Sequence, residues 1–165
     1  MKIGIVYYSR TGNTKKAAQI LEGKFKEGNA EVDLIEIQHV KKPGFFAAGR
    51  AGMKQEELPM KNTEFDLKKY DFIVTGSPTW GGSPSPFIKS FMSKAKNVKG
   101  KKVAVFSTCG GSISGREKFN GIFKTNMENA GVKTVDNYLS LQMKKEKIVD
   151  GEQNIDSFVK TVLKG

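Results

Sequence analysis

The stretch KIGIVYYSRTGNTKKAAQILEGKFKE, residues 2–27, decides the fold of this chain. Its first part, Ile3–Tyr8, is almost continuously apolar, as expected for a strand that is buried on both faces of a parallel sheet. After a polar turn, the pattern from Thr14 to Glu27 becomes that of an amphipathic helix, and Gly28 supplies a C-terminal cap. The apolar positions of this helix recur every four residues, at Ala17, Leu21 and Phe25.

Strand and helix patterns alternate along the rest of the sequence. Further strands are expected at Glu31–Ile37, Asp71–Ser77, Lys102–Ser107 and Val132–Leu141. Further helices are expected from Pro86 to about Ala95, from Arg116 to Ala130, and around residues 155–162. This alternation predicts an α/β fold, a doubly wound parallel sheet with helices on both faces. At about 150 residues per domain, the length predicts a single domain spanning residues 1–165.

The composition limits the function classes. The 165 residues include 28 Lys+Arg, 17 Asp+Glu and one Cys, with a net charge of +11. A lone cysteine excludes a disulfide framework or a thiolate metal cluster built from one chain, and we expect no metal site. No apolar run approaches the roughly 20 residues of a membrane span, so we expect a cytoplasmic protein without membrane insertion. The positive charge favours anionic partners, but no zinc-finger spacing or aromatic strand motif accompanies it, and we expect no nucleic-acid partner.

One segment, Gln38–Tyr70, interrupts the alternation. A connection of this length either serves the function or carries its own helix, and Phe46–Glu57 is compatible with an irregular helix despite its glycines. The adjacent Phe45 and Phe46 have two interpretations. We favour packing of both rings against the sheet over a partner or dimer surface.

In an open α/β sheet, ligands bind outside the carboxyl ends of the strands. The first strand is followed by a turn rich in hydroxyl groups that leads into the N-terminus of a helix, where backbone N–H groups and the helix dipole favour a phosphate. Its residues are Ser9, Arg10, Thr11, Gly12, Asn13 and Thr14. The turn lacks the ending of a Walker A loop and the three glycines of a dinucleotide fingerprint. The hydroxyls either bind phosphate or cap the helix, and Arg10 either contacts the phosphate or points into solvent.

Two uncharged segments follow the third and fourth predicted strands, Asp71–Ser77 and Lys102–Ser107. The first contains Pro78, Thr79, Trp80, Gly81 and Gly82, and the second contains Thr108, Cys109, Gly110 and Gly111. The two glycines beside Trp80 allow the backbone to approach a flat ligand, so we favour stacking of Trp80 on that ligand over packing in the core. Cys109 is interpreted as a small residue that lines the pocket, because the chain has no second thiol. Together the three segments predict a pocket for a phosphate joined to a planar, neutral ring.

At this point the chain resembles the flavodoxins. The turn Ser9–Thr14 is similar to that family's phosphate signature, Pro78–Gly82 to the loop whose aromatic side chain stacks on the flavin, and Thr108–Gly111 to the second loop beside the flavin. The resemblance implies five parallel strands in the order 2-1-3-4-5 and non-covalent FMN as the cofactor. It also implies electron transport between redox proteins through the semiquinone and hydroquinone of FMN, with no catalytic residue. The peptide at Gly81 then matches one that turns over during reduction.

The chain also departs from the flavodoxin pattern. Long-studied flavodoxins are acidic, whereas this chain is basic and has no acid in either ring-side loop. We therefore expect a less negative hydroquinone potential, and redox partners with acidic docking surfaces. An NAD(P)H-dependent FMN or quinone reductase on the same fold is the alternative. A phospho-receiver domain would need an Asp where Ser77 stands. The chain is expected to be a monomer or a homodimer.

Overall fold

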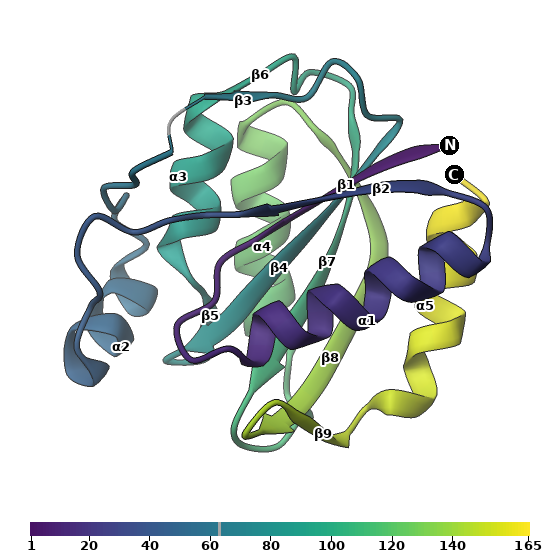
Figure 1. The fold of residues 1–165 in the computed structure, drawn as a ribbon. Helices are drawn as coiled ribbons and strands as arrows, with labels where there is room; N and C mark the ends of the chain where they lie inside the picture. Colours follow the sequence, from purple (N-terminus) through teal and green to yellow (C-terminus); the bar gives the residue numbers. More distant parts are fainter. Residues whose placement is uncertain (63) are drawn as a thin grey trace.

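A sheet with helices on both faces forms the centre of the computed structural model, which describes residues 1–62 and 64–165 (Figure 1). The helices are α1 (Asn13–Glu27), α2 (Phe45–Lys54), α3 (Pro86–Lys94), α4 (Glu117–Asn129) and α5 (Ile155–Leu163), with a 3₁₀ turn at Glu152–Asn154. The longer strands are β1 (Lys2–Tyr7), β2 (Glu31–Glu36), β4 (Phe72–Trp80), β7 (Lys102–Cys109), β8 (Lys133–Lys144) and β9 (Lys147–Asp150). The two-residue strands are β3 (Phe65–Asp66), β5 (Ser83–Pro84) and β6 (Ala95–Lys96).

Five parallel strands lie in the order β2-β1-β4-β7-β8, which is the predicted order 2-1-3-4-5. The flavodoxin-like class of the fold is thereby confirmed. The strand count was wrong, because the described sheet has seven strands. The two additions are antiparallel: β5 pairs with the end of β4, and β9 pairs with β8.

The second addition is a hairpin that the sequence pattern did not indicate. Strand β8 continues to Lys144, past the predicted end at Leu141, and turns at Lys145 and Glu146 into β9. Both turn residues have a positive φ, 47° and 62°. Tight hairpin turns of this kind normally contain Asn or Gly, whereas this turn contains neither. The missing signal explains why the hairpin was not predicted.

The helices lie close to their predicted positions. Gly28 follows α1 as its C-cap, and Pro86 occupies the first turn of α3. Helix α5 buries the four apolar residues expected of it, Ile155, Phe158, Val159 and Val162. Helix α1 is the longest, with 15 residues, and none of the described helices combines the length and apolarity of a bilayer span.

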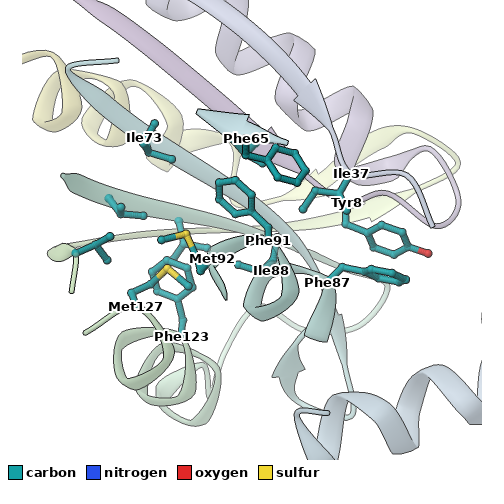
Figure 2. Packing of buried hydrophobic residues seen from close by; sticks show 14 of the residues in the cluster. Tyr8, Ile37, Phe65, Ile73, Phe87, Ile88, Phe91, Met92, Phe123 and Met127 are labelled. Atoms are coloured by element: carbon teal, nitrogen blue, oxygen red, sulfur yellow. The ribbon is translucent and has the colours of Figure 1, made fainter. Parts of the chain in front are cut away.

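The sheet separates two apolar clusters. One cluster lies beneath α1 and α5 and contains Leu21, Phe25 and Phe158. The other lies beneath α3 and α4 and contains Phe87, Phe91 and other large side chains, which Figure 2 shows packed against the sheet. Two apolar faces explain why the central strands have near-continuous apolar sequences.

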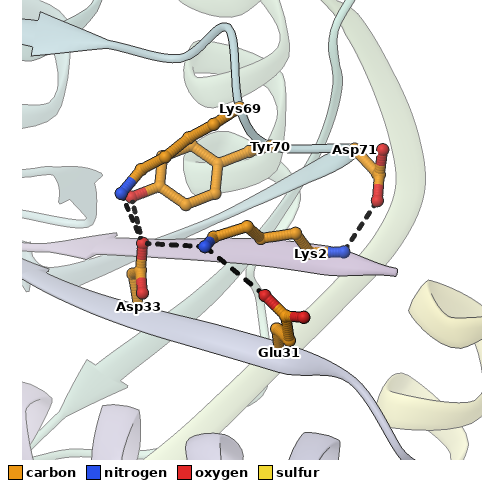
Figure 3. A network of polar contacts seen from close by, with 6 residues as sticks. All are labelled: Lys2, Glu31, Asp33, Lys69, Tyr70 and Asp71. Carbon is orange, nitrogen blue, oxygen red and sulfur yellow. Dashed lines mark hydrogen bonds and ion pairs between the residues drawn. The ribbon is translucent and has the colours of Figure 1, made fainter.

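A polar network occupies the amino ends of β1 and β4 (Figure 3). The Asp33 carboxylate accepts a hydrogen bond from the Tyr70 hydroxyl at 2.8 Å and lies 2.7 Å from the Lys69 ammonium. These two contacts lower the pKa of Asp33, with Lys69 the larger cause. The backbone N–H of Lys2 donates to Asp71 at 2.7 Å. Exposed pairs of this kind add little stability, and they lie at the amino ends of the strands, whereas a ligand is expected at the carboxyl ends.

Candidate functional site

A pocket of about 470 Å³ lies at the carboxyl ends of the parallel strands. It is lined by eleven of the predicted site residues: Arg10, Thr11, Asn13, Thr14, Pro78, Thr79, Trp80, Gly81, Thr108, Cys109 and Gly110. The lining also includes Phe45, Ala48 and Gly49, which all belong to the Gln38–Tyr70 segment. The predicted residues Ser9, Gly12, Gly82 and Gly111 lie outside the lining. The three predicted segments therefore meet in one place.

Strand register brings the segments together. In the parallel pair β4 and β7, Pro78 lies opposite Thr108, so the two uncharged loops leave the sheet side by side. Strand β1 pairs with the other edge of β4, and the N–H of Tyr8 donates to the carbonyl of Gly76 at 3.1 Å. The turn after β1 therefore begins next to the loop that follows β4.

The turn after β1 has the features of an anion site. Helix α1 has no side-chain cap, so its first-turn N–H groups keep their hydrogen-bonding capacity. The Ser9 hydroxyl accepts the N–H of Gly12 at 3.2 Å, and the Thr14 hydroxyl lies 2.8 Å from that of Thr108. The Ser9 hydroxyl thus bonds the N-cap residue Gly12, and neither of these two hydroxyls bonds an N–H group within α1 itself. Gly12 has a φ of 94°, a left-handed conformation that favours glycine.

The side chain of Asn13 ties this turn to the β8–β9 hairpin. Its amide donates to the carbonyl of Met143 at 3.3 Å and accepts the N–H of Glu146 at 2.8 Å. The Glu146 carboxylate lies so close to Gly12 that a Cβ there would collide with it. A segment more than a hundred residues away in sequence thus fixes the shape of the turn.

The sequence left two positions open for the Arg10 side chain, in contact with a phosphate or in solvent. The structure shows an arrangement between these two. The Arg10 Nε donates to the carbonyl of Pro43 at 3.1 Å, and the side chain lines the pocket. Pro43 immediately precedes the N-cap of α2. Arg10 therefore connects the turn after β1 to the beginning of α2.

Trp80 packs mainly in the core. It is the last residue of β4, 7% exposed, and its ring meets Tyr8 and Phe87 edge-on at 5.6 and 6.2 Å. These partners lie directly after β1 and on α3, so the local sequence around Trp80 could not reveal them. Stacking of a ligand on Trp80 was the favoured interpretation, and it stays a prediction, because Trp80 is mostly buried by this packing and also lines the pocket.

Helix α2 forms the remaining wall. It packs on the end of β4 through its small residues, since a Cβ on Gly52 would come within 2.7 Å of the Trp80 Cβ. Packing of both Phe45 and Phe46 against the sheet was wrong, because Phe45 is 77% exposed and Phe46 is 89% exposed. Ala48 and Gly52 make the contact instead, because only small side chains fit between helix and strand. Phe45 is thereby left in the pocket lining.

One side chain that the sequence did not single out bridges the two ring-side loops. Arg116, just before α4, donates from Nη1 to the Thr79 hydroxyl at 3.3 Å, and its Nη2 lies 2.6 Å from the Cys109 sulfur. Burial raises the pKa of the Cys109 thiol, and Arg116 opposes that rise. The charge of Arg116 was visible in the sequence, but its position between the loops depends on the fold.

A second depression, of about 600 Å³, runs along β2, Asn62 and the segment 64–70. Its described lining includes Asp33, Asp66 and Tyr70, and it contains no helix N-terminus and no glycine-rich turn. The smaller pocket holds those features, so it is the candidate site.

The geometry of the smaller pocket fits FMN. An uncapped helix N-terminus suits the phosphate at one end, and the other end is bounded by side chains without a carboxylate among the described lining residues. Arg116, which lies outside the lining, has a buried Nε without a hydrogen-bond partner within the described chain.

Comparison with known proteins agrees with this assignment. Residues 1–145 match the family described as NADPH-dependent FMN reductase, and the chain belongs to this family. A flavoprotein from Lactobacillus acidophilus NCFM, solved in complex with FMN, is similar at 23% identity and a TM-score of 0.67, covering 95% of this chain and 97% of its own. Flavodoxin 2 from Bacillus cereus is similar at 24% identity and a TM-score of 0.61, covering 99% and 96%. At these identities the structures support the flavodoxin-like fold.

Proposed function

We propose that this chain is an FMN-binding, flavodoxin-like flavoprotein that passes electrons between redox proteins. The observation that carries the proposal is a single pocket that joins the uncapped N-terminus of α1 to two uncharged loops at the ends of β4 and β7. The family match and the FMN-bound relative support FMN as the cofactor. When bound, FMN supplies reversible one-electron and two-electron redox chemistry.

The protein's own residues hold the two ends of the cofactor. The N–H groups of the first turn of α1 and the Thr11 hydroxyl bind the phosphate, and Gly12 lets the turn close around it. Pro78–Gly81 and Thr108–Gly110 enclose the ring and exclude water. Gly81 and Gly82 have φ values of 58° and 76°, so the peptide between them can change orientation with little strain.

The lining favours electron transfer over acid–base chemistry. Its titratable side chains are the Arg10 guanidinium, which has no acceptor lone pair, and Cys109, whose thiol has its pKa raised by burial. Neither side chain serves as a general base near neutral pH. A carrier that exchanges electrons needs no such base.

The second candidate is an NAD(P)H-dependent reductase, and the description of the family favours it. The two candidates differ in how electrons enter. Anaerobic titration of the FMN-loaded protein, first with dithionite and then with NADPH, distinguishes them. Long-wavelength absorbance at half reduction, together with slow reduction by NADPH, supports the carrier. Rapid bleaching by NADPH without the long-wavelength band supports the reductase.

We also propose redox partners with acidic docking surfaces. The net charge of +11 steers such partners towards the protein, and the interaction weakens as salt screens it. Electron-transfer rates to an acidic carrier protein should therefore fall as the ionic strength rises. A rate that is independent of salt would contradict this proposal.

A further inference from the structure

Arg116 contacts both ring-side loops, and its guanidinium is the main charge among the groups that make such contacts. Nη1 reaches the Thr79 hydroxyl, and Nη2 reaches both the Cys109 sulfur and the backbone carbonyl of Ser112. Thr79 and Cys109 both line the pocket, one from β4 and one from β7. One side chain therefore spans the ring end of the site from outside the lining.

The charge of Arg116 is poorly neutralised. No carboxylate of the described residues forms an ion pair with it, and its contacts are neutral groups. Asp150 on β9 also acts on Cys109 and raises the pKa of its thiol, but Arg116 opposes this with a larger effect. The electrostatic field of nearby side chains at Cys109 is thus dominated by a positive charge.

The Nε of Arg116 adds a second observation. It is buried and has no acceptor within the described chain, although a buried guanidinium N–H without an acceptor is costly. The planar fork of arginine fixes the direction of its donors, so two contacts through Nη1 and Nη2 also fix Nε. No acceptor at Nε therefore offsets the positive charge that Arg116 holds beside the two loops.

We propose that Arg116 is a redox-tuning residue, whose charge at the ring end of the pocket makes the protein bind two-electron-reduced FMN more tightly relative to oxidised FMN. This inference rests on the proposed FMN site. Two-electron-reduced FMN carries a negative charge on its ring near neutral pH, whereas the oxidised ring is neutral. A close positive charge therefore favours the reduced form, and removing it makes the midpoint potential more negative.

The test compares four variants of the FMN-loaded protein. Arg116→Gln removes the charge, and Arg116→Lys keeps the charge but loses the fork that reaches both loops. Ser112→Glu places a carboxylate beside the guanidinium, so it neutralises the charge and leaves Arg116 in place. Lys160→Gln removes one positive charge from an exposed position on α5, outside the pocket lining, and serves as the control.

The measurements are the dissociation constant of oxidised FMN and the two-electron midpoint potential. For Arg116→Gln we expect reduced FMN to lose about tenfold more affinity than oxidised FMN, the size of the effect of one nearby opposite charge. This ratio corresponds to a potential about 30 mV more negative. Ser112→Glu should shift the potential in the same direction, and Arg116→Lys and Lys160→Gln should leave it close to that of the wild type.

Two results would overturn the proposal: an unchanged potential in both Arg116→Gln and Ser112→Glu, or an equal shift in Arg116→Lys and Arg116→Gln. Ser112→Glu keeps the test decisive if Arg116→Gln does not fold. If the wild-type chain binds no FMN, the proposed function itself fails. That outcome is distinct from one in which FMN binds but its midpoint potential does not depend on Arg116.

Discussion

Gly12 shows how one residue serves both the fold and the site. It has a φ of 94°, and a Cβ at this position would have to displace the neighbouring Glu146 carboxylate. Every other residue type would strain the turn between β1 and α1, and the turn holds the phosphate end of the proposed site. The conformation of this glycine is therefore a structural requirement and a functional one.

We expect Gly12→Ala to lower the free energy of unfolding by about 1–3 kcal/mol, because alanine is strained at this φ. The matched control is Gly23→Ala in the same helix, where a Cβ meets nothing within 4 Å. That change should stabilise the protein by about 0.5–1 kcal/mol, since alanine favours the helix interior. Urea denaturation of both variants measures the difference. Equal stability of the two variants would mean that the turn is not strained.

Tyr8 illustrates a buried polar group that is used by neither fold nor site. Its hydroxyl is buried without a hydrogen-bond partner in the described chain, and burial raises its pKa from 10.0 to about 12, although Arg10 opposes the rise. The folded protein therefore keeps a proton that the unfolded chain loses between pH 10 and 12. The contribution of the Tyr8 hydroxyl to the free energy of unfolding is fully present below pH 10 and is lost as the pH rises towards 12.

We expect Tyr8→Phe to be neutral or slightly stabilising near pH 8, because it removes an unpaired hydroxyl. Above pH 10 the variant should lose less stability than the wild type, since one titrating group is gone. Urea denaturation at several alkaline pH values measures the two slopes. Parallel slopes for the two proteins would show that Tyr8 does not titrate abnormally.

At the scale of elements, α2 determines which aromatic ring faces the pocket. The small residues Ala48 and Gly52 pack on the end of β4, and this packing leaves Phe45 in the lining. Trp80 also lines the pocket, but it is 7% exposed and its ring meets Tyr8 edge-on. Phe45 is therefore the aromatic side chain with the most exposed surface in the pocket.

We expect Phe45→Ala to weaken FMN binding by about fivefold, the effect of losing one aromatic contact of about 1 kcal/mol. Phe46→Ala is the matched control, because Phe46 is its neighbour, is 89% exposed and lies outside the pocket lining. Quenching of flavin fluorescence measures both dissociation constants. A loss of equal size in the two variants would point to a general effect on α2.

The β8–β9 hairpin is a second element that shapes the site from a distance. Asn13 holds it through two hydrogen bonds, one to Met143 and one from Glu146. We expect Asn13→Ala to lower the free energy of unfolding by about 1–3 kcal/mol, at about 1 kcal/mol for each lost bond. Hydrogen exchange of the Glu146 amide should become faster, and unchanged exchange would contradict the proposed anchoring.

The sequence predicted the elements whose signal is local. The apolar run Ile3–Tyr8 and the spacing of Ala17, Leu21 and Phe25 led to the right strand and helix. The orientation of Trp80 could not be predicted in this way, because it depends on Tyr8 and Phe87, which are near it only in the folded chain. The hairpin at Lys145 and Glu146 was missed because its turn contains neither Gly nor Asn.

At the scale of the whole molecule, the site is an assembly of distant segments. The turn after β1, helix α2, the two strand-end loops and Arg116 come together because five parallel strands point their carboxyl ends in one direction. The phosphate signature and the uncharged loops were predictable from composition and position along the chain. Phe45 and Arg116 were not, since their places depend on how α2 and the start of α4 pack.

The measurement that tests the account most directly is calorimetric titration of the flavin-free protein with FMN and with riboflavin, which lacks the phosphate. We predict that FMN binds with one-to-one stoichiometry and that riboflavin binds at least about a hundredfold more weakly. Several charge-assisted hydrogen bonds at the N-terminus of α1 would be lost with the phosphate. Equal affinity for the two flavins, or no binding of FMN, would contradict the account.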